Sequence, residues 1–367
     1  MNLRRTSLGV ALVLAGCSSV PSVQELQKLK PAAFSQLDAF PAECGPAVPP
    51  QRDFTSNTYY TDSSNSIIDP ALKLTYKNSM KPFEDWGLAA TKYADKYVTT
   101  GNVQAGKCAV ALADLWASGD ALLGQLRNTD SHSQVEFMQE NTLAMITSTY
   151  LKVRGVATPN QNARISWWAQ QVASRVTSYW SYSNNSYGQN GEGGIRRNNH
   201  LSWSAVGVFN AGVLAKDPKL VSWAQAAFNE QLSNTSKDGA LLRELNRGKL
   251  SYHYTAFGIT PLAYLGQASI LVNQRWGDDP RLQKAMSFFA AATLNQDVIA
   301  KMVGVPQDDS LTTDGHPADD WVAFGLLDPT DPIRAQVAPV VTKLPDQWYL
   351  GGNTQLMIQA IKNQAVK

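Results

Sequence analysis

Residues 103–126, VQAGKCAVALADLWASGDALLGQL, place apolar side chains three to four positions apart through most of the stretch. An α-helix has about 3.6 residues per turn, so this spacing gathers the apolar side chains on one side of a helix. A half-buried strand would instead alternate apolar and polar residues. The stretch therefore predicts an amphipathic helix that packs against a core.

The same periodicity returns along most of the chain. It occurs in residues 86–98, 137–153, 165–180, 203–215, 220–232, 263–274 and 281–294. Breaks such as ATPNQN, KDPK and GDDPR separate these segments, and no stretch shows a convincing period of two. No exact sequence repeat marks a known solenoid. We expect an all-α domain over residues 66–367, in which helix pairs pack as a bundle or as a closed α/α ring.

The composition is that of an ordinary globular protein. The chain has 367 residues, of which 44% are hydrophobic and 17% are charged, with a formal net charge of +2. This charge is too small to attract a nucleic acid through the whole surface. A polyanion could therefore be bound only by a local cluster of side chains.

Residues 1–17 predict a bacterial export signal of the lipoprotein type. Arg4 and Arg5 form a basic start, LGVALVL an apolar stretch too short to span a bilayer, and LAGC a small-residue box ending at Cys17. We expect lipid attachment at Cys17 in the periplasm. The alternative is an ordinary signal peptide cleaved at a nearby small residue. We expect a monomer that contacts the membrane only through this anchor.

Residues 18–65 are rich in Pro, Ser and Asn and predict an extended segment with a polar loop. This segment contains Cys44, and Cys108 lies in the first helical stretch. With Cys17 used for lipid, two thiols remain in an oxidising compartment. We expect a Cys44–Cys108 disulfide, with free buried cysteines as the alternative.

Several kinds of chemistry receive no support from motifs. The four histidines are scattered, and the chain has no H-x-x-x-H, C-x-x-C or G-x-S-x-G pattern. The glycine-rich stretch 188–194 follows no predicted strand and lacks the lysine of a phosphate-binding loop. The sequence therefore predicts neither a metal site nor a cofactor.

One polar cluster is RRNNHLSW, residues 196–203. Arg196 and Arg197 carry permanent charge in a planar form that suits carboxylates. Asn199 offers two amide donors, and His200 titrates near neutrality. An apolar helix follows, and a helix N-terminus favours anions. The alternative is that an asparagine only caps this helix and His200 is a first-turn residue.

A second cluster lies in LLRELNRGKLSYHYTAF, residues 241–257. Arg243, Arg247 and Lys249 form a basic edge, and the sequence Tyr-His-Tyr follows from Tyr252. A tyrosine beside an arginine can pass a proton to a leaving oxygen, because the positive charge lowers its pKa. The alternative is a solvated charge run beside core aromatic residues.

Together the two clusters are suited to β-elimination on a polyuronate. A uronic acid has a weakly acidic C5 hydrogen beside its carboxylate. Removing that proton requires neutralisation of the carboxylate charge, which Asn and Arg side chains provide. A base takes the proton, and an acid protonates the departing C4 oxygen. This chemistry requires no metal and consumes no water.

The chain also resembles the alginate lyases of the polysaccharide lyase family 5 type. The resemblance covers residues 43–355 and is carried by CGPAVPP, GKCAVALADLWA, NNHLSW, ELNRG, YHYTAF and LGGNTQ. It implies an (α/α) toroid, an incomplete α/α barrel of antiparallel helix pairs, and an exported bacterial lyase that prefers mannuronate-rich alginate. It also implies the disulfide between the paired cysteines.

Carried over residue by residue, the resemblance implies a set of catalytic and binding side chains. The catalytic set is Asn199, His200, Arg247 and Tyr252, and Trp203 would stack on sugar. We add six further candidates for substrate binding, which are Lys73 (with Lys77 as its rival), Arg196, Arg197, Arg243, Lys249 and Tyr349.

Two departures from the family pattern stand out. The stretch between Arg247 and Tyr252 is two residues shorter than in the family, so Arg243 or Lys249 could take over the arginine's place. Tyr349 stands where the family has an arginine. Both departures leave the preferred uronate open.

Two alternative functions remain open from the sequence. An α/α-barrel glycoside hydrolase would need two suitably spaced carboxylates, for which Glu192, Glu244 and Asp85 are candidates. The second is a non-catalytic polyuronate-binding lipoprotein.

For the elimination itself, the identity of the base also stays open. On mannuronate one tyrosine could act as base and acid in turn, whereas on guluronate His200 would have to be the base.

Overall fold

The computed structural model describes residues 30–31, 34, 39–62, 65–130, 134–187, 197–308 and 319–365. Arg196, Glu192 and Cys17 lie outside these residues. The longer helices are α2 (Pro70–Thr100), α3 (Val103–Ser118), α4 (Gln134–Val153), α5 (Pro159–Tyr187), α7 (Asn199–Ala215), α8 (Pro218–Ser233), α9 (Ser251–Ala268), α10 (Pro280–Leu294) and α15 (Thr354–Ala365). The shorter ones are η2 (Ala42–Cys44), η3 (Arg154–Val156), η4 (Glu244–Leu250), η5 (Ser269–Val272), η6 (Trp276–Asp278), α11 (Asp297–Val303), η7 (Asp319–Trp321), α13 (Val322–Gly325), α14 (Pro332–Val337) and η8 (Trp348–Leu350).

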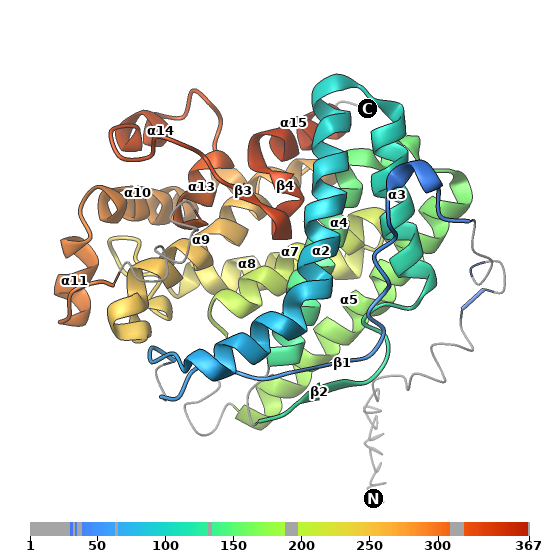
Figure 1. The fold of residues 1–367 in the computed structure, drawn as a ribbon. Helices are drawn as coiled ribbons and strands as arrows, with labels where there is room; N and C mark the ends of the chain where they lie inside the picture. Colours follow the sequence, from blue (N-terminus) through green and yellow to red (C-terminus); the bar gives the residue numbers. More distant parts are fainter. Residues whose placement is uncertain are drawn as a thin grey trace, which may run out of the picture.

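Consecutive helices pack as pairs around a common core (Figure 1). α2 packs on α3, α4 on α5, and α7 on α8. Very short connections reverse the chain within two of these pairs, through Gly101–Asn102 and through Lys216–Asp217. Short helix–helix connections place neighbours antiparallel, so the arrangement consists of antiparallel helix pairs.

Asp-Pro pairs begin four of the helices. Asp69, Asp217, Asp279 and Asp331 each cap a helix with their side chain, and proline follows at the first helical position. The carboxylate accepts from backbone N–H groups that have no partner within the helix, and proline has no N–H to satisfy there. The breaks recognised in the sequence at KDPK and GDDPR are therefore helix starts.

The core is built from helices that are buried on nearly all sides. Every residue of α4 from Met138 to Val153 is buried, and the buried side chains on all sides of α7 include Trp203. Gly207 of α7 permits close contact with α4, because a Cβ there would lie 3.0 Å from the backbone nitrogen of Ala144. α4 and α7 are therefore central helices of the core, although α4 also buries polar side chains such as Glu140 and Lys152.

Four short strands occur that the sequence did not predict. β1 (Phe54–Ser56) pairs in parallel with β2 (Leu126–Asn128), and β3 (Asp346–Gln347) pairs antiparallel with β4 (Gly352–Asn353). Each is three residues or fewer, which is too short for a period-two pattern to be visible. β1 lies inside the N-terminal segment and joins it to the helical body.

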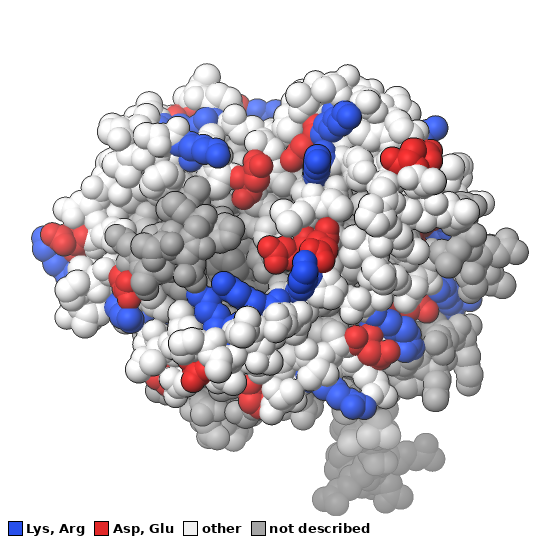
Figure 2. Space-filling model, in the orientation of Figure 1, with Lys and Arg blue, Asp and Glu red and all other residues white. Residues whose placement is uncertain are grey.

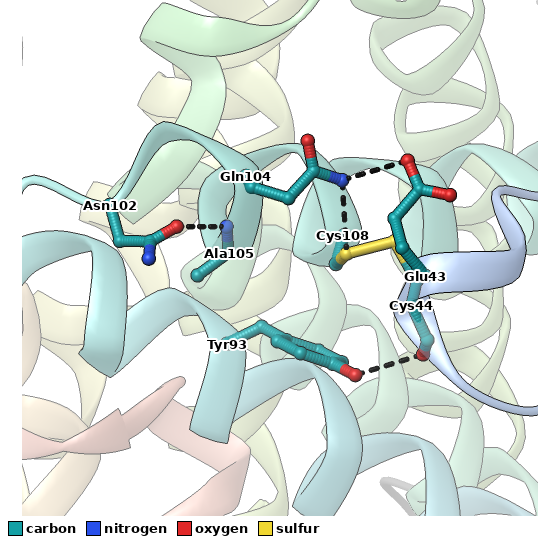
Figure 3. The surroundings of a disulfide bond; sticks show 7 residues. All are labelled: Glu43, Cys44, Tyr93, Asn102, Gln104, Ala105 and Cys108. Atoms are coloured by element: carbon teal, nitrogen blue, oxygen red, sulfur yellow. Dashed lines mark hydrogen bonds between the residues drawn. A yellow bond between two sulfur atoms is a disulfide. The ribbon is translucent and has the colours of Figure 1, made fainter.

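The N-terminal segment is fastened to the helices by several contacts. The sulfurs of Cys44 and Cys108 form a disulfide between positions 64 residues apart (Figure 3). The Tyr93 hydroxyl donates to the carbonyl of Cys44 at 2.9 Å, and Nε1 of Trp116 donates to that of Val48 at 2.9 Å. The segment thus follows the surface of α2 and α3 before it reaches β1 (Figure 1).

One apolar segment is long enough to cross a membrane by length and composition alone. Residues Glu244–Val272 have the length and hydropathy of a membrane span, but 72% of the apolar window is buried inside the fold. This burial identifies α9 and its neighbours as core helices of the domain.

Candidate active site

A cavity of about 1210 Å³ lies between the helices, the N-terminal segment and the β3–β4 strand pair. Its walls come from α2, α4, α5, α7 and α9, together with residues 58–60, Asn65, Arg247, Asp320 and residues of 346–352. This volume exceeds the range of about 300–1,000 Å³ that is usual for sites of small ligands. The cavity is therefore large enough for several units of a polymer.

The first wall is the beginning of α7. Asn198 caps the helix, and the side chains of Asn199 and His200 line the cavity. Nδ2 of Asn199 donates to Oε2 of Glu244 at 2.8 Å, and the His200 ring stacks on Phe137 with centroids 4.0 Å apart. A helix N-terminus presents backbone N–H groups and a positive dipole end, which favour a bound anion.

Arg247 of η4 also lines the cavity. Its side chain is almost fully buried, and Nη2 donates to the backbone carbonyl of Asn65 at 2.7 Å. The guanidinium carbon lies 3.2 Å from the ring centroid of Tyr254 and 5.4 Å from that of Tyr60. A cation over an aromatic face is attracted by the ring quadrupole, so both tyrosines help to hold the guanidinium in place.

Tyr254 places a phenol at the cavity beside this cation. Its hydroxyl shares a hydrogen bond with the Tyr60 hydroxyl, and both residues line the cavity. Burial raises the pKa of Tyr60 above its ordinary value, and the neighbouring Tyr254 and Tyr59 raise it further. Tyr60 therefore keeps its proton and can donate a hydrogen bond to the Tyr254 oxygen.

Tyr252, the tyrosine chosen from the sequence, does not line the cavity. Its hydroxyl donates to Oγ1 of the buried Thr293 at 3.2 Å, and its ring stacks on Phe289. Residues two positions apart on an α-helix point about 200° apart, so Tyr252 and Tyr254 face opposite sides of α9. The tyrosine assignment therefore moves to Tyr254, and the two-residue shortfall from Arg247 disappears with it.

Arg197 and Arg243 are held away from the cavity, contrary to the sequence prediction. Nε of Arg197 donates to Glu230 at 2.6 Å, and Nη1 of Arg243 donates to the same carboxylate at 3.1 Å. Nη1 of Arg243 also donates to the Arg197 carbonyl at 2.7 Å. A carboxylate from α8 thus binds both guanidinium groups and joins two chain segments.

The predicted lysines also lie elsewhere. Lys249 forms an exposed ion pair with Asp308 at 2.7 Å, and neither Lys73 nor its rival Lys77 lines the cavity. The cavity lysine of the described residues is Lys92, further along α2, which the sequence reading missed. Of Arg243, Arg247 and Lys249, only Arg247 lines the cavity.

Trp203 and Tyr349 line the cavity as predicted for their positions. Trp203 is 0% exposed, and its Nε1 donates to the carbonyl of Phe257 at 3.1 Å. Such a ring supports the cavity from below and is too deeply buried to be an open stacking surface. The Tyr349 ring packs against Trp203 and against Trp348, whose centroid lies 4.1 Å away.

The structure adds a histidine that the sequence analysis did not select. His253 lines the cavity, and its Nδ1 lies 2.8 Å from Oδ1 of the buried Asp320. A carboxylate partner favours the proton on Nδ1 and leaves Nε2 as the acceptor. The Tyr-His-Tyr sequence contained this signal, but Asp320 is distant in the sequence.

The charges around the cavity are mixed. Its described lining carries Arg247 and Lys92 beside four acidic residues, which are Glu84, Asp95, Asp320 and Asp346. Figure 2 shows Lys and Arg interspersed with Asp and Glu among the described residues, without a continuous patch of either sign. Within these same residues, no group of three or more His, Cys, Asp and Glu could hold a metal ion. A carboxylate ligand would therefore be bound by specific donors and not by a general basic field.

Comparison with known proteins relates the chain to polysaccharide lyases. A family model described as Alginate lyase matches residues 53–299. A polysaccharide lyase of Stenotrophomonas maltophilia (strain K279a) is 32% identical over 249 residues, covering 68% of this chain and 71% of the relative. An alginate lyase of Pseudomonas syringae pv. tomato is 24% identical over 218 residues, 58% of this chain and 54% of that protein.

The fold of the chain also resembles those of solved alginate lyases. Alginate lyase A1-III from Sphingomonas species A1 superposes with a TM-score of 0.66 at 20% identity, over 93% of this chain and 97% of that one. An alginate lyase from Bacteroides ovatus gives a TM-score of 0.55 at 14% identity, over 92% of this chain and 93% of that one. The predicted all-α toroid of antiparallel helix pairs is confirmed.

The fold and the cavity together define a helical polysaccharide lyase. The chain belongs to the alginate lyase family. Its activity is therefore the cleavage of alginate by elimination, as the sequence predicted, and the hydrolase and binding-protein alternatives are not favoured. Asp85, one carboxylate considered for hydrolysis, lies outside the cavity lining in an exposed ion pair with Lys81 at 2.7 Å.

Proposed function

We propose that this lyase cleaves mannuronate-rich alginate by syn β-elimination, with Tyr254 as the acid and base. The observation that carries the proposal is that Tyr254, Arg247, Asn199 and His200 all line one cavity. They combine a phenol, a cation, an amide and an imidazole at the beginning of one helix and across from it. The new non-reducing end would carry a 4,5-unsaturated uronic acid.

Asn199 and Arg247 would neutralise the substrate carboxylate. The amide nitrogen of Asn199 carries two hydrogens, of which one is donated to Glu244, and α7 adds its positive dipole end. Arg247 brings a permanent charge to the opposite side of the cavity. Both groups stabilise the negative charge that moves onto the carboxylate when the C5 proton leaves.

Tyr254 would move the proton. As a phenolate it takes the C5 hydrogen, the C4–O bond breaks, and the electron pair forms the C4–C5 double bond. The resulting phenol then gives the same proton to the departing C4 oxygen. In mannuronate the C5 hydrogen and the C4 oxygen lie on one ring face, so a single group can reach both. Tyr60 would stabilise the phenolate by donating its hydroxyl hydrogen.

His200 would contact the sugar beside Asn199. On guluronate the C5 hydrogen lies on the opposite face from the leaving oxygen, and a second group such as His200 would have to serve as base. The proposed preference for mannuronate therefore follows from the tyrosine pair Tyr60–Tyr254. His200→Ala is expected to be severely impaired on mannuronate as well, because the ring borders the reacting sugar.

Two further solved structures support the assignment of this cavity. A histidine-to-alanine variant and a tyrosine-to-phenylalanine variant of alginate lyase A1-III have each been solved in complex with a tetrasaccharide. In this chain His200 and Tyr254 are a histidine and a tyrosine that line the cavity. We expect the same class of ligand, an alginate oligosaccharide, to lie between them.

The testing experiment measures the ultraviolet absorbance of the unsaturated product. Polymers of mannuronate, guluronate and glucuronate would be supplied separately to the wild-type enzyme and to Tyr254→Phe. We expect a rise on mannuronate that the variant lacks. A faster rise on guluronate would refute the mannuronate preference, and absence of a rise on every polymer would refute the lyase assignment.

We also propose that the protein is an exported, monomeric lipoprotein. The Cys44–Cys108 disulfide supports an oxidising compartment. Radiolabelled palmitate should enter the wild-type protein and not Cys17→Ser when each is expressed in a bacterial host. Unlabelled wild-type protein released in soluble form would favour simple signal cleavage. Light scattering of the released domain should give the monomer mass, and a dimer mass would contradict the proposal.

A further inference from the structure

Glu244 is a buried carboxylate directly behind the proposed carboxylate-binding groups. It is 1% exposed and begins η4, whereas Asn199 begins α7. Oε2 accepts from Nδ2 of Asn199 at 2.8 Å, and the backbone N–H of Asn199 also favours the charged form of this carboxylate. The carboxylate therefore contacts both the amide side chain and the N-terminus of the helix that carries it.

Protein groups fill the rest of the space around this carboxylate. A Cβ on Gly258 of α9 would lie 3.1 Å from Oε1 of Glu244, so that helix packs directly against it. Arg247 follows one turn later on η4, and its charge acts on Glu244, as does that of Arg243. The carboxylate thus faces an amide from α7, two guanidinium groups from its own segment, and a glycine from α9.

We infer that Glu244 is a positioning residue of the lyase, which orients the Asn199 amide toward the substrate carboxylate and balances the charge of Arg247. This inference rests on the proposed function. The ionised carboxylate accepts the Nδ2 hydrogen of Asn199 without having to place a proton of its own. One amide hydrogen is held by Glu244, and the second is directed to the substrate. Glu244 itself does not line the cavity.

The inference predicts a particular pH dependence. Burial raises the pKa of Glu244 to about 7, against the opposing effects of the Asn199 hydrogen bond and of the Arg247 and Arg243 charges. As the pH falls through this range, the carboxylate takes up a proton and becomes a donor. The protonated Glu244 then donates a hydrogen bond of its own, which disturbs the arrangement in which Asn199 donates to Glu244. The rate should therefore fall on the acid side, through loss of the orientation of Asn199.

The first test compares pH profiles of kcat/KM on polymannuronate, from about pH 5 to about pH 9. Glu244→Gln preserves shape and an acceptor oxygen but cannot ionise. We expect the acid limb to disappear in this variant, and kcat at high pH to fall about 10- to 100-fold because the donors are misplaced. The matched control is Glu140→Gln, which changes a buried carboxyl whose pKa is also raised by burial. Its acid limb should equal that of the wild type.

A second test keeps Glu244 and changes its partner. Asn199→Ala should reduce the amplitude of the acid limb, since the carboxylate acts mainly through this amide. Glu244→Gln and Asn199→Ala should also be less than additive in kcat when combined, as expected for two residues acting as a unit. The profile of Asn199→Ala alone tests whether Asn199 is connected to the acid limb. This test is therefore informative even if Glu244→Gln folds less stably than the wild type.

The outcomes separate the inference from the proposed function. A wild-type enzyme with no product on any polymer would refute the proposed function. An active wild type whose acid limb persists in Glu244→Gln, or at full amplitude in Asn199→Ala, would overturn the role of Glu244 alone. Additive effects of the two substitutions would overturn it as well.

Discussion

The guanidinium carbon of Arg247 lies 3.2 Å from the ring centroid of Tyr254, so the cation covers the face of the phenol that lines the cavity. Arg247 is fixed from a third side by the carbonyl of Asn65, 182 positions away in the chain. This contact couples the charge that would neutralise a substrate carboxylate to the group that would transfer the proton. Of the two tyrosines in the Tyr-His-Tyr sequence, Tyr254 is the one that lines the cavity.

The two tyrosines give a matched pair of variants. Tyr254→Phe removes the hydroxyl that lines the cavity and should lower kcat on polymannuronate by at least about 100-fold, since both proton transfers depend on it. Tyr252→Phe removes a hydroxyl that bonds to Thr293 and does not line the cavity. It should retain most activity and cost about 1 kcal/mol of unfolding free energy. Product absorbance and urea denaturation measure the two effects, and the reverse pattern of activity would restore the assignment to Tyr252.

Tyr60 should shift the pH dependence of the reaction. Its pKa is raised by burial and by the neighbouring tyrosines, so it stays protonated and can donate a hydrogen bond to the Tyr254 oxygen. Tyr60→Phe removes a hydrogen bond to the ionised form of Tyr254, which makes ionisation harder. The rise of kcat/KM with pH should therefore move to higher pH in Tyr60→Phe. A shift to lower pH, or no shift, would show that Tyr60 does not donate to Tyr254.

The disulfide should contribute to stability rather than to the chemistry. Cys44 and Cys108 are 64 positions apart, and in the chain-entropy model closing a loop of this length stabilises the fold by about 4 kcal/mol. The paired variant Cys44→Ser with Cys108→Ser should unfold at a lower temperature while keeping kcat, because neither residue lines the cavity. Calorimetry with and without reductant measures the effect. An unchanged Tm after reduction would contradict it.

A buried lysine should hold the strand pair at the other end of the cavity. The Lys152 side chain is 0% exposed, and its Nζ donates to Asp95 and to the carbonyls of Gly351 and Asn353. Removing one partner of a buried ion pair leaves the other charge uncompensated, so Lys152→Met should cost about 3–5 kcal/mol.

The matched control for this lysine is the double variant with Asp95→Asn, which removes both charges. It should recover part of the lost unfolding free energy, as measured by urea denaturation. Equal losses in the single and double variants would indicate that the ion pair itself contributes little. The backbone carbonyls of the strand pair would then be the important partners of Lys152.

The helices could be derived from the sequence because their signals are local. The three-to-four spacing and the Asp-Pro pairs act within one or two turns, and Asp217 and Asp279 cap helices where the sequence showed breaks. The short strands could not be derived, because each depends on a partner from another part of the chain. β1 pairs with β2 about 70 residues later, and neither is long enough to show a period.

Two arginines show the same contrast between local sequence signals and tertiary packing. Arg197 and Arg243 have the charge expected of a carboxylate-binding site, and the sequence analysis placed them there. In the folded chain α8 brings Glu230 to both of them, and a fixed ion pair satisfies each guanidinium. Charge is a property of the residue, whereas its partner is chosen by the packing of separate helices.

The sequence alone predicted the helical class, the Cys44–Cys108 disulfide and the two segments that line the cavity, because spacing, capping and residue type are encoded locally. Only the tertiary structure decided between Tyr252 and Tyr254, brought Tyr60 and Asn65 to Arg247, and placed Glu244 behind Asn199. The physical reason is that a helix turns about 100° per residue. A residue's neighbours therefore depend on which side of the helix the core covers, and that side is settled by long-range packing.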